Sequence, residues 1–556
     1  MRLPGWQRTL VIAALIGVAG ALSTLAFREL ILYTERVVYG TGGINGSLVH
    51  IAQTLSWWQR MLAPAVGGVL AGLALAWARR QPEREQGGDY MEAVVLGKGD
   101  LPARASLLRA LSATATVVSG GAIGREGPMV QLAALCGALA GRWQQVPVPR
   151  RRLYVACGAA AGITTAYNAP IAGAMFVAEI VLHSLAIESL GPLIVAAVAA
   201  NLVLASWAGY APVYHMPTIV LARGAPTLLL ALLGLAAGVL APGYLALIDG
   251  SRKLFGRWHG PLWQKLGVGG LLAGAISVLH PGVWGNGYSV VNAMLQGNWL
   301  WQALLVILVL KVLAVAATVG SGAVGGIFTP TLFTGAAVGA LFGVLLNAWL
   351  PGLVPVPAAV AVGMGAFLAA STHAPLMSIL MLFEMTESYS LMVPLMAACV
   401  LAHTVSRLLR ERSIYAVGNA ATPPARAVTM AADLLRTDPP VVRPGQSMLE
   451  LEQAFARWRW QHLYVTDAGG TFLGAVSRHD FAPALGAASD PAQPWPATLL
   501  RADYPSVRDS APFWQVVETF ATHPGERLPV LGEGRVLAGY VTKTDVVLML
   551  RQITGE

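Results

Sequence analysis

Apolar residues run almost without interruption from the start of the chain to residue 415, and only short polar breaks divide them. These breaks fall near 79–104, 142–152, 250–265 and 281–300. At about 20 residues for each membrane-spanning helix, the pattern allows well over ten helices. Several runs are too short, or too often interrupted by Gly and Pro, to cross a bilayer, so we expect discontinuous or re-entrant helices. The first run is expected to be a retained membrane segment, because no convincing cleavage site follows it.

The apolar part contains an internal repeat. Three elements recur in the same order at nearly constant separation: 88–91 with 286–289, 124–128 with 326–330, and 168–179 with 373–384. The repeat divides this part into two halves, 1–215 and 216–415. Broken helices at matching positions of two halves indicate a substrate site at the repeat interface, near the bilayer midplane. We therefore predict an all-α polytopic membrane domain with broken helices and internally repeated halves, which we expect to be inverted.

The pattern becomes that of an ordinary soluble protein after this part. Residues 416–437 contain a Pro-Pro pair and are expected to form a linker. The tail beyond them is a second repeat, in which 438–443 matches 503–508 and 474–480 matches 539–545. Each copy predicts a strand, a helix, two short apolar strands and a closing helix. We therefore predict tandem α/β domains at the C-terminus, which cover about 438–495 and 496–556.

Composition agrees with a membrane protein. Charged residues make up 12% of the 556 residues, about half the usual share for soluble proteins, and hydrophobic residues make up 55%. The net charge is +9, and Arg clusters at 79–80, 150–152 and 407–412 flank apolar segments, as expected for cytoplasmic loops. The sequence shows no patch that combines basic with aromatic residues, so we expect no nucleic-acid partner.

The sequence offers no catalytic or metal-binding constellation. Cys136, Cys157 and Cys399 lie in apolar segments without paired spacing, and are expected to be small core residues. The histidines are scattered without ligand spacing. We therefore expect neither an enzyme nor a metal site nor a bound cofactor.

Gly124-Arg-Glu-Gly-Pro128 places two charged side chains inside a very apolar stretch. Ionisable residues within membrane segments usually face an aqueous path or a partner, so Arg125 and Glu126 are candidate functional residues. The flanking Gly and Pro predict a broken helix with Pro128 at its first position. A helix N-terminus at membrane depth presents free N–H groups and the positive end of the helix dipole, which favours an anion site.

Together the motifs resemble the CLC family of chloride channels and proton-coupled chloride antiporters. The resemblance rests on Gly124-Arg-Glu-Gly-Pro128, Gly325-Gly-Ile-Phe-Thr-Pro330, Asn168-Ala-Pro170, Phe383-Glu-Met-Thr386 and Tyr415. The segments 89–93, 284–289 and 413–415 are most similar to the bacterial ClcB-like branch. The tail resembles a tandem pair of CBS domains.

The resemblance implies transmembrane chloride transport with a named set of residues. Glu126 would be the gate, because its carboxylate competes with chloride for the same donors and protonation releases them. The anion ligands would be the backbone amides of Ile327 and Phe328, the outer position at Gly127 and the inner hydroxyl of Tyr415. Arg125 would support the pore. The resemblance also implies a homodimer with one pore in each subunit, in a bacterial inner membrane, with the CBS tail in the cytoplasm.

Two departures from the family pattern bear on mechanism. Gly88 stands where the family usually has a serine that contacts the anion, and Asp89 beside it would repel an anion if it pointed inward. A nitrate- or fluoride-preferring relative therefore stays open. Ile180 replaces the second of two acidic residues that antiporters commonly carry, whereas Glu179 and Glu384 are expected to be structural helix-end groups. We expect a channel-like or weakly proton-coupled protein, with a fully coupled chloride/proton antiporter as the alternative.

Two other classes remain as alternatives. A CBS-regulated cation transporter should place several acidic residues in its pore, but this membrane part is poor in Asp and Glu. A membrane sensor with an inactive pore is disfavoured by the intact gate and anion motifs.

Two short motifs in the tail resemble the nucleotide sites of CBS pairs. They are Ser477-x-x-Asp480 and Thr542-x-x-Asp545. An Asp can accept hydrogen bonds from both ribose hydroxyls, and a Ser or Thr can reach a phosphate. An adenine nucleotide is therefore a candidate ligand, and a tail that only couples subunits is the alternative.

Overall fold

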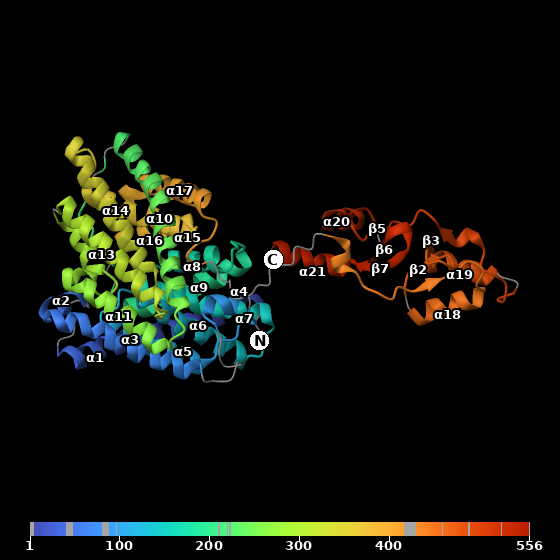
Figure 1. Ribbon diagram of the computed structural model, residues 1–556, viewed down its shortest axis with the longest axis horizontal. Coiled ribbons are helices and arrows are strands. Elements are labelled where there is room, and N and C mark those ends of the chain that lie inside the picture. The colour runs from blue at the N-terminus through green and yellow to red at the C-terminus, as the bar shows by residue number, and fades with distance from the viewer. Residues whose placement is uncertain are drawn as a thin grey trace. The chain divides into compact units, whose positions relative to one another are not determined.

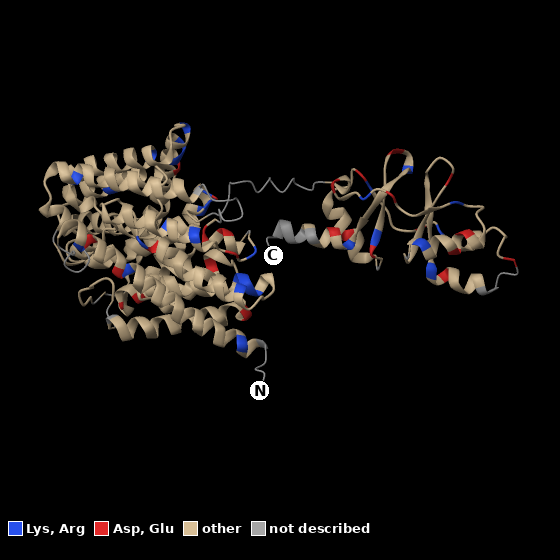
Figure 2. Ribbon diagram, turned by 90° about the horizontal axis from the view of Figure 1, so that it is seen from below, with Lys and Arg blue, Asp and Glu red and all other residues tan. Residues whose placement is uncertain are grey.

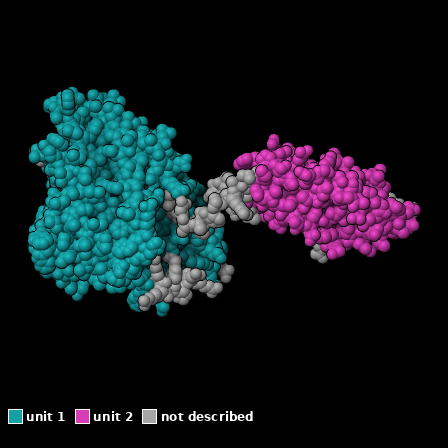
Figure 3. Space-filling model, in the orientation of Figure 1, with its two compact units in different colours: residues 1–417 teal, residues 418–556 magenta. Residues whose placement is uncertain are grey.

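The computed structural model divides the chain into two compact units, residues 1–417 and residues 418–556 (Figure 3). It describes residues 5–40, 48–79, 88–95, 97–209, 212–219, 221, 224–297, 299–415, 430–458, 460–487, 490–523 and 525–554. Each unit has its own hydrophobic core.

The described part of the first unit is helical (Figure 1). Its helices are α1 (Gly5–Tyr39), α2 (Leu48–Thr54), α3 (Trp57–Arg79), α4 (Tyr90–Val95), α5 (Ala103–Val118), α6 (Glu126–Trp143), α7 (Val148–Tyr167), α8 (Pro170–Phe176), α9 (Ile187–Ala208), α10 (Ala225–Arg257), α11 (Leu262–Leu279), α12 (Tyr288–Gln296), α13 (Trp301–Gly320), α14 (Phe328–Trp349), α15 (Val356–Thr372), α16 (Pro375–Thr386) and α17 (Met392–Leu409). Among the described residues, eight helices are long and apolar enough to cross a membrane. The predicted all-α polytopic domain is confirmed.

Broken helices occur at matching places, as predicted. The short helices α4, α8 and α12 have six, seven and nine residues, too few to cross a bilayer. α7 and α15 each end at a residue in the left-handed conformation, Asn168 at φ 51° and His373 at φ 59°. The next helix then begins two residues later with a proline, at Pro170 and at Pro375. One difference separates the two breaks: α8 passes into a π-helical turn at Val177–Val181.

The start of α6 differs from the prediction in one detail. The helix begins at Glu126, so Pro128 is its third residue and not its first. The N–H groups of a first helical turn have no acceptor within the helix, so a proline at the third position costs no helical hydrogen bond. The charged Glu126 therefore lies in the first turn itself.

Small residues allow the helices of this unit to approach closely. Charged side chains are sparse over the unit (Figure 2), so packing and not ion pairing dominates its interior. A Cβ on Gly137 in α6 would stand 2.0 Å from the carbonyl oxygen of Tyr154 in α7. A Cβ on Gly339 in α14 would stand 2.1 Å from that of Ala359 in α15. The same glycine-dependent contact thus recurs in both halves, as is typical of membrane helix pairs.

The described residues of the second unit form two small sheets, in which three strands have the same arrangement and the first sheet has a fourth strand. The elements of this unit are β1 (Val441–Val442), α18 (Met448–Trp458), β2 (His462–Thr466), β3 (Phe472–Ser477), α19 (Arg478–Ala487), β4 (Leu500–Arg501), β5 (Val507–Arg508), α20 (Phe513–Thr522), β6 (Arg527–Leu531), β7 (Leu537–Thr542) and α21 (Lys543–Thr554). The strand orders are β1-β2-β3-β4 and β5-β6-β7. In each sheet the first pair is parallel and the next antiparallel, and the registers Val442↔Val465 and Val507↔Val530 match. The predicted α/β tail is confirmed.

Part of the predicted linker, residues 416–429, lies outside the described residues. From Met430 onward the chain lies against the second sheet. The Ala431 N–H donates to the Ala511 carbonyl at 2.8 Å, and Arg436 and Tyr540 exchange backbone hydrogen bonds of 2.9 and 3.0 Å. This short segment therefore belongs to the folded second unit.

Candidate functional site

The two Gly-x-x-x-Pro segments meet at the centre of the first unit. Gly124 and Gly326 exchange backbone hydrogen bonds, each 2.8 Å long, and so form an antiparallel bridge. α6 begins two residues after the first glycine, and α14 begins two residues after the second. The positive ends of both helix dipoles therefore converge on one place, with one helix from each half.

Glu126 lies at this meeting point and is almost fully buried, at 3% exposure. The Thr329 hydroxyl donates to its Oε1 at 2.6 Å, and the Tyr288 hydroxyl donates to the same atom at 3.4 Å. Its Oε2 lies close over the backbone bridge, because a Cβ on Gly124 would stand 1.8 Å from it. A side chain of any kind at position 124 would therefore displace the carboxylate.

The predicted anion ligands lie around the same point. Ile327 is the residue before α14, and Phe328, at 4% exposure, is its first residue, so their N–H groups belong to the turn that has no helical acceptors. The Gly127 Cα is close to the other break, since a Cβ there would stand 3.1 Å from the Gly326 nitrogen. The Phe176 ring lies between Phe328, at 6.2 Å, and Tyr415, at 5.4 Å. Glu126, the two amides and Tyr415 are thus brought together from distant parts of the sequence.

The Asp89 carboxylate has a hydrogen-bond partner in the structure. It is exposed, and its Oδ1 accepts the Glu92 N–H at 3.0 Å, which caps α4. The Tyr90 N–H, directly after Asp89, donates to the side-chain oxygen of the buried Gln131 at 2.8 Å. Gly88 precedes this cap and supplies no hydroxyl.

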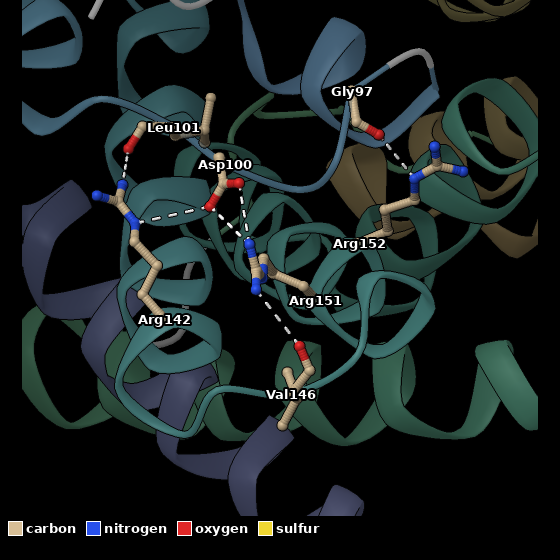
Figure 4. A network of polar contacts seen from close by, with 7 residues as sticks. All are labelled: Gly97, Asp100, Leu101, Arg142, Val146, Arg151 and Arg152. Atoms are coloured by element: carbon tan, nitrogen blue, oxygen red, sulfur yellow. Dashed lines mark hydrogen bonds and ion pairs between the residues drawn. The ribbon is translucent and has the colours of Figure 1, made fainter. Parts of the chain in front are cut away.

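An arginine network holds the segment that follows α4 (Figure 4). Asp100 pairs with Arg151 at 2.9 Å and with Arg142 at 3.9 Å, and Arg142 also donates to the carbonyl of Leu101. Arg152 donates to the Gly97 carbonyl at 2.8 Å. The Arg cluster singled out in the sequence at 150–152 therefore ties the 97–101 segment to the start of α7.

The second departure, Ile180, is buried at 5% exposure within the π-helical turn. Its neighbour Glu179 accepts the N–H groups of Leu376 and Met377, at 3.3 and 2.7 Å, at the start of α16. In the other half, the Glu384 carboxylate accepts the N–H groups of two residues at the start of α8, 2.9 and 2.7 Å away. Each carboxylate thus caps a helix of the opposite half, in agreement with the structural helix-end role predicted for both.

A polar cavity of about 780 Å³ opens beside the gate candidate. Among the described residues, its lining includes Arg28, Arg125, His215, Asn286 and Tyr288, and no Asp or Glu. Arginine side chains in the wall of a cavity favour a small anion there, although Arg28 also pairs with Glu29 at 3.8 Å. Tyr288 both lines the cavity and contacts Glu126, so it joins the cavity to the gate.

Several residues of this site were not predicted from the sequence. Thr329 lies inside the 325–330 motif and Tyr288 inside the 284–289 segment, but neither motif indicates that a hydroxyl would meet Glu126. Lys311, which is fully buried in α13, could have been found by the rule that singled out Glu126, because it is an ionisable residue in an apolar helix.

The two candidate nucleotide motifs of the tail differ in how their aspartates are engaged. Asp545 uses both oxygens: Arg436 donates to Oδ1 at 2.7 Å and to Oδ2 at 2.8 Å, and Thr542 donates to Oδ2 at 2.6 Å. Partial burial raises the pKa of Asp545, but these hydrogen bonds outweigh it and hold the pKa below its usual value. In the first motif, Arg501 contacts only the Oδ2 of Asp480, at 2.8 and 2.7 Å.

A cavity of about 450 Å³ lies beside the first motif. Ser477, His462, Tyr504 and Arg501 line it together with Trp460, whose ring lies 4.3 Å from the Arg527 guanidinium. Aromatic faces and arginines suit a ligand that has both a flat ring and a negative group.

Comparisons with known proteins cover both units. The family described as "Voltage gated chloride channel" matches residues 67–407, and the CBS domain family matches residues 431–487 and 497–551. A ClcB-like chloride channel protein from Ralstonia nicotianae is 52% identical over 412 residues, which cover 73% of this chain and 95% of the relative. The voltage-gated ClC-type chloride channel ClcB from Salmonella typhimurium is 43% identical over 415 residues, which cover 73% of this chain and 98% of the relative.

A solved structure has the same fold. The crystal structure of a slow cyanobacterial chloride/proton antiporter matches with a TM-score of 0.64 at 23% identity, over 75% of this chain and 97% of that chain. The family match spans more than half of this chain, and both relatives are covered almost completely. The chain therefore belongs to the voltage-gated chloride channel (CLC) family of membrane transport proteins and carries a C-terminal pair of CBS domains.

Proposed function

We propose that the membrane unit carries chloride between the cavity beside Arg125 and the inner side at Tyr415, and that Glu126 is the gate on this path. One observation carries the proposal: the Glu126 carboxylate lies where the N-termini of α6 and α14 converge. Helix N-termini stabilise an anion without a full positive charge, so the ion can be held and released. The carboxylate occupies the place that favours chloride.

Protonation is the step that opens such a gate. An ionised carboxylate competes with chloride for the donors at the helix starts, and a neutral carboxylic acid does not. Low pH should therefore increase chloride flux. Gly127, Ile327 and Phe328 would supply backbone donors once the carboxylate leaves, Tyr415 would close the inner side, and Arg125 would support the positive potential of the entrance.

Glu126→Gln tests the proposal, because the amide has the same shape and does not titrate. Purified protein in liposomes should carry chloride at a rate that no longer changes with pH between about 4 and 8, the range in which a carboxyl group with an ordinary or raised pKa titrates. Chloride and proton movement are recorded together. A variant that keeps the pH dependence of the wild type would overturn the assignment of the gate.

We propose passive or weakly proton-coupled transport, because Ile180 stands where antiporters commonly carry an acidic residue that accepts protons on the inner side. Within the same π-helical turn the titratable side chain is that of Glu179, and this carboxylate caps α16. A fully coupled chloride/proton antiporter is the second candidate. A pH gradient shifts the reversal potential of an antiporter and leaves that of a channel unchanged, so one electrical measurement separates them.

We propose that the protein is a homodimer with one pore in each subunit, in a bacterial inner membrane, and that its CBS pair lies in the cytoplasm and regulates transport. The first CBS motif, Ser477 and Asp480, is the better candidate for an adenine nucleotide, since it has the adjoining cavity and an aspartate oxygen outside the Arg501 contact. Thr542 and Asp545 would bind one only if Arg436 moved away.

A further inference from the structure

Hydroxyl groups from three helices form a cluster on the Oε1 side of the Glu126 carboxylate. Besides the bonds of Thr329 and Tyr288 to Oε1, the Thr329 hydroxyl lies 3.4 Å from the Tyr167 hydroxyl and 3.5 Å from that of Tyr288. Thr329 is 1% exposed and Tyr167 is 2% exposed. The three side chains come from α14, α12 and the end of α7, so the cluster exists only in the folded unit.

From this geometry we infer that Thr329 and Tyr288 are positioning residues that hold the Glu126 carboxylate in its blocking position and set the pH at which the gate opens. The inference rests on the proposed gating role of Glu126 and adds the groups that control it.

The physical basis is that a hydroxyl that donates to a carboxylate stabilises the charged form more than the neutral acid. A buried, charge-assisted hydrogen bond of 2.6 Å is a strong one, whereas a contact of 3.4 Å is weak. Thr329 should therefore contribute most, and Tyr288 less. When the gate leaves, the Thr329 hydroxyl still has Tyr167 and Tyr288 within 3.5 Å, so the open state does not leave it unpaired.

The ionisable groups that face Glu126 directly are an arginine and four tyrosines, whose charges do not ordinarily change near neutrality. They are Arg125 beside it in sequence, Tyr167 from α7, Tyr214 from the segment after α9, Tyr288 from α12, and Tyr415. Arginine stays charged, and tyrosines ordinarily titrate near pH 10. Two further titratable groups lie nearby: His215 lines the cavity that adjoins Tyr288, and Glu35 interacts with Arg125. The Glu126→Gln variant keeps both, so any pH dependence that remains in it belongs to them.

Thr329→Val and Thr329→Ser form a matched pair for the test. Valine keeps the shape and removes the hydroxyl, and serine keeps the hydroxyl and removes a methyl group. Chloride flux is measured in liposomes as a function of pH and normalised to the flux at low pH. We expect the midpoint of opening to move to higher pH by about one unit in Thr329→Val, since a hydrogen bond to a charged group is worth roughly that shift, and to stay near wild type in Thr329→Ser.

Tyr288→Phe provides a second, independent measurement. We expect its midpoint of opening to move to higher pH as well, but by less than in Thr329→Val. Equal midpoints in wild type, Thr329→Val and Tyr288→Phe would overturn the inference, and so would equal shifts in Thr329→Val and Thr329→Ser. If Thr329→Val does not fold, an unshifted Tyr288→Phe overturns it alone.

Glu126→Gln separates this inference from the proposed function. If Glu126→Gln still shows the wild-type pH dependence, the gate assignment fails and the positioning role fails with it. If Glu126→Gln loses the pH dependence while Thr329→Val keeps the wild-type midpoint, only the positioning role fails. In the Glu126→Gln background, Thr329→Val should add no pH dependence.

Discussion

At the scale of single residues, Lys311 shows how an amine is held inside an apolar helix. Its Nζ donates to the carbonyls of Val283 and Gly285, at 2.8 and 2.7 Å, and lies 5.3 Å from the centre of the Phe333 ring. Both acceptors belong to the turn just before α12, the helix that begins with Tyr288. Lys311 therefore fixes the segment that carries one of the hydroxyls on the gate.

Replacing Lys311 by Met should destabilise the membrane unit. Methionine fills the space of the lysine stem, but two buried carbonyls lose their donor, which costs about 2–5 kcal/mol of unfolding free energy. Chemical denaturation in detergent measures the loss. Lys253→Met, at an exposed position of α10, is the matched control and should change the free energy by less than about 0.5 kcal/mol. Equal stability of the two variants would show that the carbonyls find other donors.

At the scale of elements, the reciprocal caps are the clearest sign of a two-fold relation between the halves. Glu179 of the first half caps α16, and Glu384 of the second half caps α8. The Gly124–Gly326 bridge is reciprocal in the same way. When a residue of the first half contacts an element of the second half, and the equivalent residue of the second half makes the same contact in return, the two halves are related by a two-fold axis, as the subunits of a symmetric dimer are. This supports the expectation of inverted halves, which we put forward as a proposal.

The symmetry predicts equal effects for two distant substitutions. Glu179→Gln and Glu384→Gln each remove the charge that caps a helix start and weaken a pair of N–H bonds, so each should lower the unfolding free energy by about 1 kcal/mol. Denaturation in detergent measures both. Glu188→Gln is the control, since that exposed residue lies in the first turn of α9. A loss confined to one of the two caps would argue against equivalent halves.

At the scale of the whole molecule, the sequence predicted architecture better than local geometry. The repeated Gly and Pro segments predicted where the helices break, and the 65-residue repeat of the tail predicted its strands and helices. Both predictions were possible because these backbone conformations require particular residue types. The contacts of the gate could not be predicted in the same way. Thr329 stands 203 residues from Glu126, and the two come together only because the starts of α6 and α14 meet at the Gly124–Gly326 bridge.

The two CBS motifs give a prediction that concerns the chain as a whole. Arg436 follows the segment that joins the units, and it engages both oxygens of Asp545, so the second motif is closed by this chain's own side chain. Asp480 keeps its Oδ1 outside the Arg501 pair, and Ser477 of the same motif lines a cavity of about 450 Å³. An adenine nucleotide should therefore bind the full chain in detergent with one equivalent per subunit.

Calorimetric titration with ATP and AMP measures this stoichiometry. Asp480→Asn should weaken binding by about tenfold or more, because an amide accepts fewer hydrogen bonds from a ribose than a carboxylate does. The matched Asp545→Asn should leave the affinity unchanged, since its carboxylate is already used. Arg436→Ala should free the second motif and add a second equivalent. Loss of binding in Asp545→Asn with normal binding in Asp480→Asn would reverse the assignment of the two sites, and it would mean that the nucleotide displaces Arg436 and thereby acts on the segment that leads back to the membrane unit.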